Sequence, residues 1–375
     1  MSTAADPAGP GEGAAPAGAP RLLRTAVVGS YSVPEWLGRV KTDFHLGRAS
    51  PELLGEINEM AIKAALIDQL HAGIDVVSDG EYRRDNDMDH FVERLPGVAL
   101  TGPPKTYYFD YLEAAARSRL PEPDDFGGFG LVDHLAFMQG LTDHEVTVSM
   151  PGPFSLSRRI ANEAYPDEGA LVQALARLLG AEARRLEAAG ATRLQIDEPF
   201  LAGYPEAVRV AIAGLNTLTE GITARVALHV CYGNRYARPA WEGHYDFLFP
   251  TVLGAHVDEL VLEFARKGLD DLALFRPEPE RFVVGCGVID VKSREVESAE
   301  TVAGRLRQAL RTVPPEQLAV NPDCGLRHLP VAVARAKLEA MVKGAAIVRA
   351  ELGGAETAPE EPLPHRVGIL GGEPS

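Results

Sequence analysis

The sequence predicts an α/β protein, a (β/α)8 barrel of the TIM type with a long insertion after the second strand. Short runs rich in β-branched residues alternate with longer amphipathic or Ala-, Leu- and Arg-rich segments, which is the pattern of parallel βα units. Eight such units fit into roughly 330 residues, and eight most naturally close as a barrel. An open doubly wound sheet is the alternative, but no G-x-G-x-x-G turn follows the first run.

The expected strands are short apolar runs in which Val and Ile are frequent. They span Thr25–Ser30, Ile74–Glu81, Glu145–Met150, Thr192–Pro199, Arg225–Cys231, Asp258–Phe264, Arg281–Asp290 and Gln317–Gly325. Helices of matching length are expected between the strands. The clearest helical patterns are Leu53–Ala72, Ala170–Ala189, Ala299–Thr312 and Leu329–Ala350.

The insertion separates the second strand from the third. It covers Tyr82–Asp143 and is rich in Pro, Gly, Tyr and Asp. Two short stretches in it, Phe91–Leu95 and Asp110–Ser118, are expected to be helical. The stretch Ser78–Met88 carries so many charges that part of it is expected to be a solvated loop.

Both ends of the chain are expected to lie outside the barrel. Residues 1–20 consist largely of Pro, Gly and Ala, so burial cannot offset the entropy of ordering them, and they are expected to be a disordered tail. They also lack the basic start and apolar stretch of a secretory signal. Residues 353–375 are rich in Gly, Pro and Glu and are expected to be a flexible tail. A single barrel domain over residues 21–352 is therefore predicted.

Composition excludes several classes of partner. The 375 residues carry a net charge of -16, which argues against nucleic acid or an anionic membrane as a partner. No apolar stretch reaches the length of a membrane span. The three cysteines, Cys231, Cys286 and Cys324, cannot all pair and are too few for a disulfide scaffold. They favour a reducing, cytoplasmic location.

Nearly every expected strand ends on polar or reactive side chains. In a TIM barrel, the carboxyl ends of all eight strands surround one mouth, where active sites lie. These residues are therefore expected to converge although they are distant in sequence. They are Ser30, Asp79, Glu81, Asp197, Glu198, His229, Cys231, Glu263, Asp290, Asn321, Asp323 and Cys324.

A metal site is the first chemistry that this convergence suggests. His229 and Cys231 stand two positions apart at the end of a strand, so their side chains point to the same side. Zn²⁺ prefers four ligands drawn from Cys, His and carboxylates. An H-x-C pair alone is unspecific, and a packed core pair is its alternative reading. Glu263 and Cys324, at the ends of two other strands, complete a tetrahedral set.

Each further ligand has an alternative reading. A lone carboxylate among apolar residues, as in LVLEFA, is costly to bury without a cation, but Glu263 could instead pair with Arg266. Cys324 could be a small buried hydrophobic residue. Cys286 is an alternative ligand near a strand end, although its GCG context indicates close packing.

Several motifs carry a resemblance to a known family. They are LHVCYGN, LVLEFAR, GVIDVKS and NPDCGL, with VVGSY, SDGEYRRDNDM and LQIDEP in the same order. They resemble the catalytic half of cobalamin-independent methionine synthase over about Arg24 to Leu352. The wider family shares a (β/α)8 barrel with uroporphyrinogen decarboxylase and includes single-barrel core methionine synthases and epoxyalkane:coenzyme M transferase. The chain is similar to the single-barrel members, because the extra N-terminal barrel of the long synthases is missing.

The resemblance implies zinc held by His229, Cys231, Glu263 and Cys324, and a methyl group transferred to a thiol, with homocysteine as the favoured acceptor. The ligand chemistry agrees with this. Two thiolates and a carboxylate give Zn²⁺ a negative ligand shell, which makes it a poor Lewis acid for splitting water. The same shell suits a metal that keeps a substrate thiol deprotonated and nucleophilic, so S-alkylation is favoured over hydrolysis.

The resemblance also implies an amino-acid pocket. Val28–Ser30, Glu81 and Asp197 match the positions that hold homocysteine, and two carboxylates with a hydroxyl suit an ammonium group. Capping and strand-end solvation are the alternative roles of the two carboxylates. The alternative function is that of an epoxyalkane:coenzyme M transferase-like enzyme or the alkylation of a specialised-metabolite thiol. Coenzyme M has a sulfonate and no ammonium group. Two ionised carboxylates would repel it unless one paired elsewhere.

The chain departs from the long synthases at three places, and these leave the methyl donor open. Arg158 and Arg159 lie in the segment where those enzymes have a Trp that stacks on folate, and Gly203 replaces a folate-contacting Glu. Lys292 stands where a proton-donating His is proposed. Lys292 could donate a proton to the leaving group or be a solvated loop lysine. The donor could be a methyl-folate, methylcobalamin on a partner protein, or a strained electrophile such as an epoxide.

A third class of function is a non-enzymatic methyl- or corrinoid-binding barrel, or a metal-free relative of the decarboxylases. The ligand set disfavours this class. Metal analysis would separate it from the two thiol-alkylating enzymes.

Overall fold

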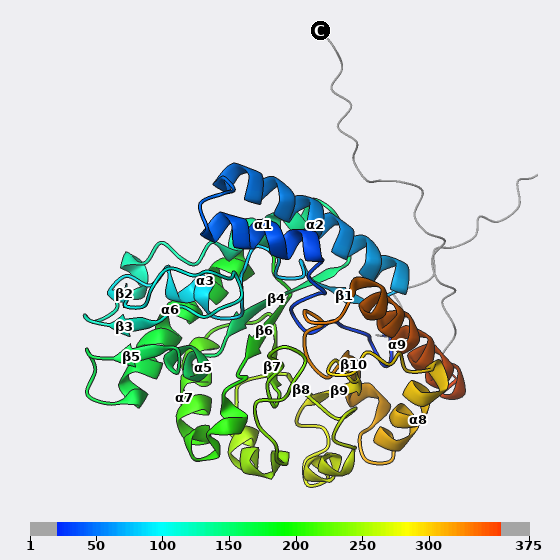
Figure 1. The fold of residues 1–375 in the computed structure, drawn as a ribbon. Helices are drawn as coiled ribbons and strands as arrows, with labels where there is room; N and C mark the ends of the chain where they lie inside the picture. The colour runs from blue at the N-terminus through cyan, green and yellow to red at the C-terminus, as the bar shows by residue number, and fades with distance from the viewer. Residues whose placement is uncertain (1–20, 354–375) are drawn as a thin grey trace, which may run out of the picture.

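A curled sheet of parallel strands forms the centre of the molecule (Figure 1). The computed structural model describes residues 21–353, and within them this sheet has seven strands in the order β1-β4-β6-β7-β8-β9-β10. The strands are β1 (Val76–Val77), β4 (Glu145–Pro151), β6 (Arg193–Asp197), β7 (Arg225–Val230), β8 (Glu259–Leu262), β9 (Val283–Ile289) and β10 (Leu318–Pro322). The strands of this sheet lie side by side in the same order as they follow one another along the chain. This order is expected for repeated βα units in a TIM-barrel-like core. The two expected tails, residues 1–20 and nearly all of 353–375, lie outside the described residues.

The first expected strand is much shorter than the sequence predicts. Thr25 forms a bridge to Val320 of β10, and Ala26 forms one to Val76 of β1, so this segment contacts both edge strands of the sheet. In the described chain these are isolated bridges and not a strand over Thr25–Ser30. Gly29 follows with φ +57°, a left-handed conformation that breaks the extended run.

Helices cover the outside of the sheet (Figure 1). They are α1 (Glu35–His45), α2 (Pro51–Ala72), α6 (Glu168–Ala188), α7 (Val208–Leu218), α8 (Ala299–Ala309) and α9 (Val331–Glu351). The four clearest helical patterns of the sequence are therefore confirmed. Capping explains where three of them begin, because Ser50, Asp167 and Ser298 each accept a hydrogen bond from a backbone N–H of the first turn.

Two connections differ from the expected alternation of strand and helix. Between β7 and β8, and between β8 and β9, the described chain forms only short 3₁₀ helices: η4 (Tyr245–Leu248), η5 (Thr251–Gly254) and η6 (Asp270–Phe275). The expectation of helices of matching length is wrong there. Pro250 separates η4 from η5, and Pro277 follows η6; proline disfavours a longer helix because it lacks a backbone donor.

The segment between β1 and β4 contributes to a second, small sheet, on the left in Figure 1. Its strands β2 (Val98–Leu100) and β3 (Ala114–Ala116) pair antiparallel, and β3 pairs parallel with β5 (Ile160–Asn162). The segment also holds α3 (Asp89–Val92), η1 (Pro123–Asp125) and α4 (Leu131–Gln139). The prediction of a helix over Asp110–Ser118 is wrong. Strand pairing of β3 with β2 and β5 overrides the helical propensity of its three alanines.

Candidate metal and substrate site

Three of the four expected metal ligands lie together at one end of the sheet. His229 is the last residue but one of β7, Cys231 directly follows that strand, and Cys324 lies two positions after β10; one ligand atom of each lies within 4.8 Å of the others. The two sulfurs are 3.6 Å apart. Two sulfurs bound to one tetrahedral zinc at about 2.3 Å would lie about 3.8 Å apart, so the spacing fits a shared metal.

The imidazole of His229 is prepared for a ligand. Its Nδ1 lies 3.0 Å from the carbonyl oxygen of Val261 on the neighbouring strand β8, which makes Nδ1 the donor. Its Nε2 is buried, and among the described residues it has no hydrogen-bond partner. Metal-binding histidines in proteins show this arrangement, in which one ring nitrogen is held by a carbonyl and the other is free. The residues present therefore fit a zinc ion.

Glu263, the fourth expected ligand, is held differently. It lies directly after β8 and is fully buried, at 0% exposure. One carboxylate oxygen accepts a hydrogen bond from Arg266 Nε at 3.0 Å, and the other accepts one from Lys292 Nζ at 2.7 Å. The carboxylate is thus outside the group of three and is bound by two cations. The pairing of Glu263 with Arg266, the alternative reading of its sequence context, is present, and its role as a metal ligand stays a prediction.

Two further residues fix the main chain around Glu263. The buried hydroxyl of Tyr245 donates to the carbonyl of Val230, next to Cys231, and accepts from the backbone N–H of Glu263, both at 2.9 Å. Asp323 accepts three backbone hydrogen bonds of 2.8–3.0 Å from residues 264–266. The sequence marked Asp323 only as one of many polar strand ends, and it gave no sign of Tyr245, which lies in a connection far from any motif.

The residues of the expected amino-acid pocket adjoin the expected metal ligands. Asp197 ends β6 directly opposite His229 of β7, and Gln195 donates to its carboxylate at 2.8 Å. Burial raises the pKa of Asp197 to about 7; the charge of His229 opposes this rise, whereas that of Glu81 adds to it. Asp197 therefore lies close to both Glu81 and the proposed metal ligand.

Glu81 has neighbours that the sequence did not indicate. It is 6% exposed and adopts φ +58°, an uncommon conformation for a residue with a side chain. Ser149 donates to one of its oxygens at 2.5 Å. Arg84 lies 3.6 Å from that oxygen, and Arg327 lies 3.6 Å from the other. Its negative charge is therefore partly neutralised.

Close approaches of the backbone bring Ser30 and Glu81 to this end of the sheet. A Cβ on Gly325 would overlap the Ser30 hydroxyl, and one on Gly29 would lie 2.5 Å from a Glu81 oxygen. The Ser30 carbonyl also accepts a hydrogen bond of 2.8 Å from the N–H of Leu326. Ser30 is thus held beside the loop that carries Cys324.

Other strand-end residues have structural environments. Glu198 accepts hydrogen bonds from the N–H groups of Phe154 and Ser155, and so caps the short helix α5 (Pro153–Ser157). Cys286 is fully buried within β9, burial raises the pKa of its thiol, and it is not in the metal-type group. The alternative reading of Cys286 as a ligand therefore receives no support.

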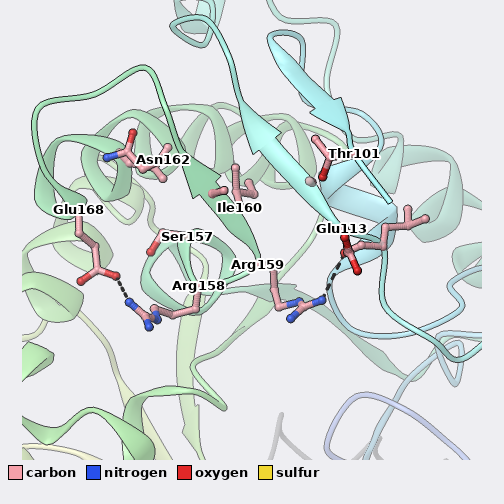
Figure 2. A pocket seen from close by; sticks show the side chains of 12 residues that line it. Thr101, Glu113, Ser157, Arg158, Arg159, Ile160, Asn162 and Glu168 are labelled. Carbon is pink, nitrogen blue, oxygen red and sulfur yellow. Dashed lines mark hydrogen bonds and ion pairs between the residues drawn. The ribbon is translucent and has the colours of Figure 1, made fainter. Parts of the chain in front are cut away.

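A separate pocket lies beside the small sheet (Figure 2). It has a volume of about 650 Å³ and is lined by Arg158 and Arg159, among other residues. Arg158 pairs with Glu168 at 2.7 Å and lies over the ring of Tyr204 at 4.1 Å. Arg159 lies 4.2 Å from the ring centre of Tyr111. The expected metal ligands do not line this pocket.

The second departure from the long synthases, Gly203, has a steric explanation. A Cβ on Gly203 would overlap the ring of Trp241, which also contacts Phe200 and Tyr204 edge-on. A glutamate at position 203 would therefore require the Trp241 ring to move.

Comparison with known proteins identifies the family. The family model described as the cobalamin-independent synthase, catalytic domain, matches residues 23–347. The chain belongs to this family. It is 34% identical over 335 residues to a methionine synthase of Sulfurisphaera tokodaii, covering 88% of this chain and 94% of that protein. A methionine synthase of Pyrococcus abyssi is 33% identical over 342 residues, covering 90% and 96%.

Solved structures show the same likeness. The B12-independent methionine synthase of Shewanella sp. W3-18-1, in complex with selenomethionine, is similar with a TM-score of 0.78 and 29% identity, over 88% of this chain and 99% of that one. A methyltransferase from Methanosarcina mazei, at 15% identity and a TM-score of 0.57, shares the fold alone. This member of the cobalamin-independent synthase family thus combines the family fold with a His–Cys–Cys group at one end of its sheet.

Proposed function

We propose that this chain is a zinc-dependent thiol methyltransferase that methylates homocysteine to methionine. The observation that carries the proposal is the convergence of two thiols and an imidazole with a free Nε2, at His229, Cys231 and Cys324. Membership of the cobalamin-independent synthase family supports it, as do relatives named methionine synthase.

The metal would be held by His229, Cys231 and Cys324, with Glu263 as the fourth ligand. When bound, zinc would keep the acceptor sulfur deprotonated near neutral pH, where a free thiol with a pKa near 8.5 is mostly protonated. Because the protein ligands supply three negative charges, activation of water is disfavoured, and thiol chemistry is favoured over hydrolysis.

The protein's own side chains would orient the acceptor. We assign Ser30, Glu81 and Asp197 to its ammonium group, with charge-assisted hydrogen bonds. Glu81 is buried, and its negative charge acts on the carboxyl group of Asp197. A cation between the two carboxylates would therefore relieve their mutual repulsion. Proton donation by Lys292 to the leaving group stays a prediction.

The methyl donor would bind in the pocket of Figure 2. Its volume of about 650 Å³ lies within the range of small-molecule sites. Arg158 and Arg159 can bind the carboxylates of a methyl-folate, but Arg158 already pairs with Glu168 and Glu113 also lines the pocket, so its charge does not select between a methyl-folate and an epoxide. Methylcobalamin on a partner protein is the remaining donor class.

One observation favours a second candidate, an enzyme of the coenzyme M type that opens an epoxide. Arg84 and Arg327 flank Glu81, so the pocket is less negative than its two carboxylates suggest. A sulfonate would therefore meet less repulsion there than the sequence indicated.

The experiment that tests the proposal incubates zinc-loaded protein with homocysteine and, separately, with coenzyme M. Each thiol is combined with methyl-folate, methylcobalamin and a short epoxide, and products are identified by mass spectrometry. We expect methionine from homocysteine and a methyl donor, and none with Cys324→Ser. Alkylation of coenzyme M alone would establish the second candidate, and no alkylated thiol from any pair would contradict both.

We further propose that the seven-stranded sheet and the Thr25–Ala26 segment close as one (β/α)8 barrel domain over residues 21–352, with residues 82–143 as an insertion. Bridges of this segment to β1 and β10 support the closure. A cytoplasmic location, and the lack of nucleic-acid and membrane partners, stay predictions from the cysteine count and the net charge. Over residues 21–353, the helices are too short or too polar to cross a membrane.

A further inference from the structure

Glu263 is bound by two cations. Lys292 and Arg266 bind its two oxygens at 2.7 and 3.0 Å. Cys231 and Cys324 also lie near Lys292: burial lowers the pKa of Lys292, but the charges of Glu263 and of the two cysteines raise it. The side chain of Lys292 is only 4% exposed, so its ammonium group forms a buried ion pair with a fully buried carboxylate. Removing one partner of such a buried ion pair is costly, because it leaves the other charge uncompensated.

The main chain around Glu263 is fixed independently of its side chain. Tyr245 holds its backbone N–H at 2.9 Å, and Asp323 holds the N–H groups of the next three residues. Lys292 is also fixed, since its own N–H bonds to Asp290 at 2.8 Å. The Glu263 carboxylate therefore changes partner on a main chain that other side chains hold in place.

We propose that Lys292, with Arg266, is a positioning residue that receives the Glu263 carboxylate when the acceptor thiol takes its place at the metal. This inference rests on the proposed function. It differs from the role of Lys292 as a proton donor, because Lys292 keeps its proton throughout and acts through Glu263.

The exchange balances in charge and in protons. The bond between the metal and a Glu263 oxygen breaks, and the bond between the metal and the acceptor sulfur forms. The thiol proton leaves to solvent, so one negative ligand replaces another. The displaced carboxylate stays ionised, and Lys292 and Arg266 compensate its charge. Without Lys292, the displaced carboxylate would remain buried with one cation fewer, and thiol binding would cost more free energy.

Cobalt-loaded protein makes the exchange visible, because the thiolate-to-cobalt absorption band reports the number of bound sulfurs. Homocysteine is titrated into wild type, Lys292→Met and Lys292→Arg. We expect Lys292→Met to weaken thiol binding about tenfold to a hundredfold, as for the loss of a charged hydrogen bond. Lys292→Arg should stay within about threefold of wild type, since it keeps the charge.

The Glu263→Gln background tests whether Lys292 acts through Glu263. There the Lys292→Met substitution should change thiol binding by less than about twofold, since no carboxylate is displaced. An equally large effect in both backgrounds would overturn the proposal. Circular dichroism and cobalt content establish that each variant is folded and loaded. If Lys292→Met is not, Lys292→Gln replaces it, because it keeps a hydrogen-bond donor without the charge.

Two outcomes separate this inference from the proposed function. If Lys292→Met binds thiol as wild type does but loses turnover, Lys292 is a proton donor and the inference is wrong, while the proposed function stands. If the cobalt band of wild type responds to no thiol, the proposed function itself is wrong.

Discussion

One hydrogen bond decides what His229 can do. The carbonyl of Val261 occupies Nδ1 and leaves Nε2 without a partner in the described structure, in a position where a buried polar atom is otherwise costly. The two cysteine sulfurs lie at the spacing of tetrahedral zinc ligands. The unpartnered Nε2 of His229 and the spacing of the two sulfurs, more than the residue types alone, thus indicate where a metal would bind.

The first prediction concerns these atoms. Purified protein should carry about one zinc per chain, and His229→Ala and Cys324→Ser should each lose most of it, because each removes one of the three nitrogen and sulfur ligands proposed to hold the metal. Cys286→Ser is the matched control: it also changes a buried cysteine, but one outside the group. Metal analysis by plasma mass spectrometry checks this. Equal zinc in all four proteins would reject the assignment.

The second prediction concerns the acceptor pocket. Asp197→Asn and Glu81→Gln should each weaken binding of homocysteine about tenfold to a hundredfold, since a charged hydrogen bond contributes roughly 1.5–3 kcal/mol. Binding of a simple alkyl thiol, which has no ammonium group, should change little and serves as the control. Both affinities can be measured on the cobalt-loaded protein. Equal losses for the two thiols would show that these carboxylates do not bind an ammonium group.

At the scale of elements, buried carboxylates at the strand ends organise the loops. Asp323 binds three N–H groups of the loop after β8, whereas Glu198 binds two N–H groups at the start of α5. Both are almost fully buried. Their chemistry is the same, but only Asp323 adjoins the metal-type group.

The third prediction uses this pair. Asp323→Ala and Glu198→Ala should both lower the free energy of unfolding, by about 2–4 kcal/mol, because buried N–H groups lose their acceptor. Only Asp323→Ala should also weaken zinc binding, since it frees the loop between Glu263 and Arg266. Urea unfolding of the metal-free proteins and competition with a zinc chelator measure the two effects. Zinc binding lowered equally by both substitutions would contradict the specific role of Asp323.

At the scale of the whole molecule, Asp85 joins parts of the chain that are far apart in sequence. Its carboxylate contacts Lys41 and His45 of α1 and Lys105 of the segment between β1 and β4. Its carbonyl accepts from Arg327, in the loop after Cys324. Burial by itself would raise the pKa of Asp85, but the hydrogen bond from His45 and the charges of the two lysines outweigh burial and hold it below its usual range.

The fourth prediction follows from that shift. A carboxyl group whose pKa is lower in the folded chain contributes stability above its unfolded pKa of about 3.9 and loses it as pH falls through the folded value. Asp85→Asn should therefore reduce the free energy of unfolding by about 2 kcal/mol between about pH 5 and pH 8. The difference from wild type should shrink below about pH 4. Urea unfolding across this range measures it, and a difference that grows as pH falls would contradict the assignment.

The sequence alone was sufficient for the features that local patterns encode. Alternating apolar runs and amphipathic stretches predicted the parallel strands and the long helices α2, α6, α8 and α9, because burial periodicity and caps are properties of neighbouring residues. The prediction of a helix was wrong at β3, where strand pairing determines the structure. The alanines of β3 pair with residues more than ten positions away in sequence on either side. The family motifs also indicated which side chains would gather at one end.

Only the tertiary structure decided which of these groups bind one another. Cys231 and Cys324 are 93 positions apart, and their 3.6 Å contact depends on how the whole sheet curls. The partners of Glu81 and Glu263 set the charge around the two carboxylates. Arg84 and Arg266 lie three positions after them in the same motifs, whereas Arg327 and Lys292 come from other loops. The pairs of Glu81 with Arg327 and of Glu263 with Lys292 join different motifs, because a long-range contact is fixed by packing of the whole chain and not by the residues beside it in sequence.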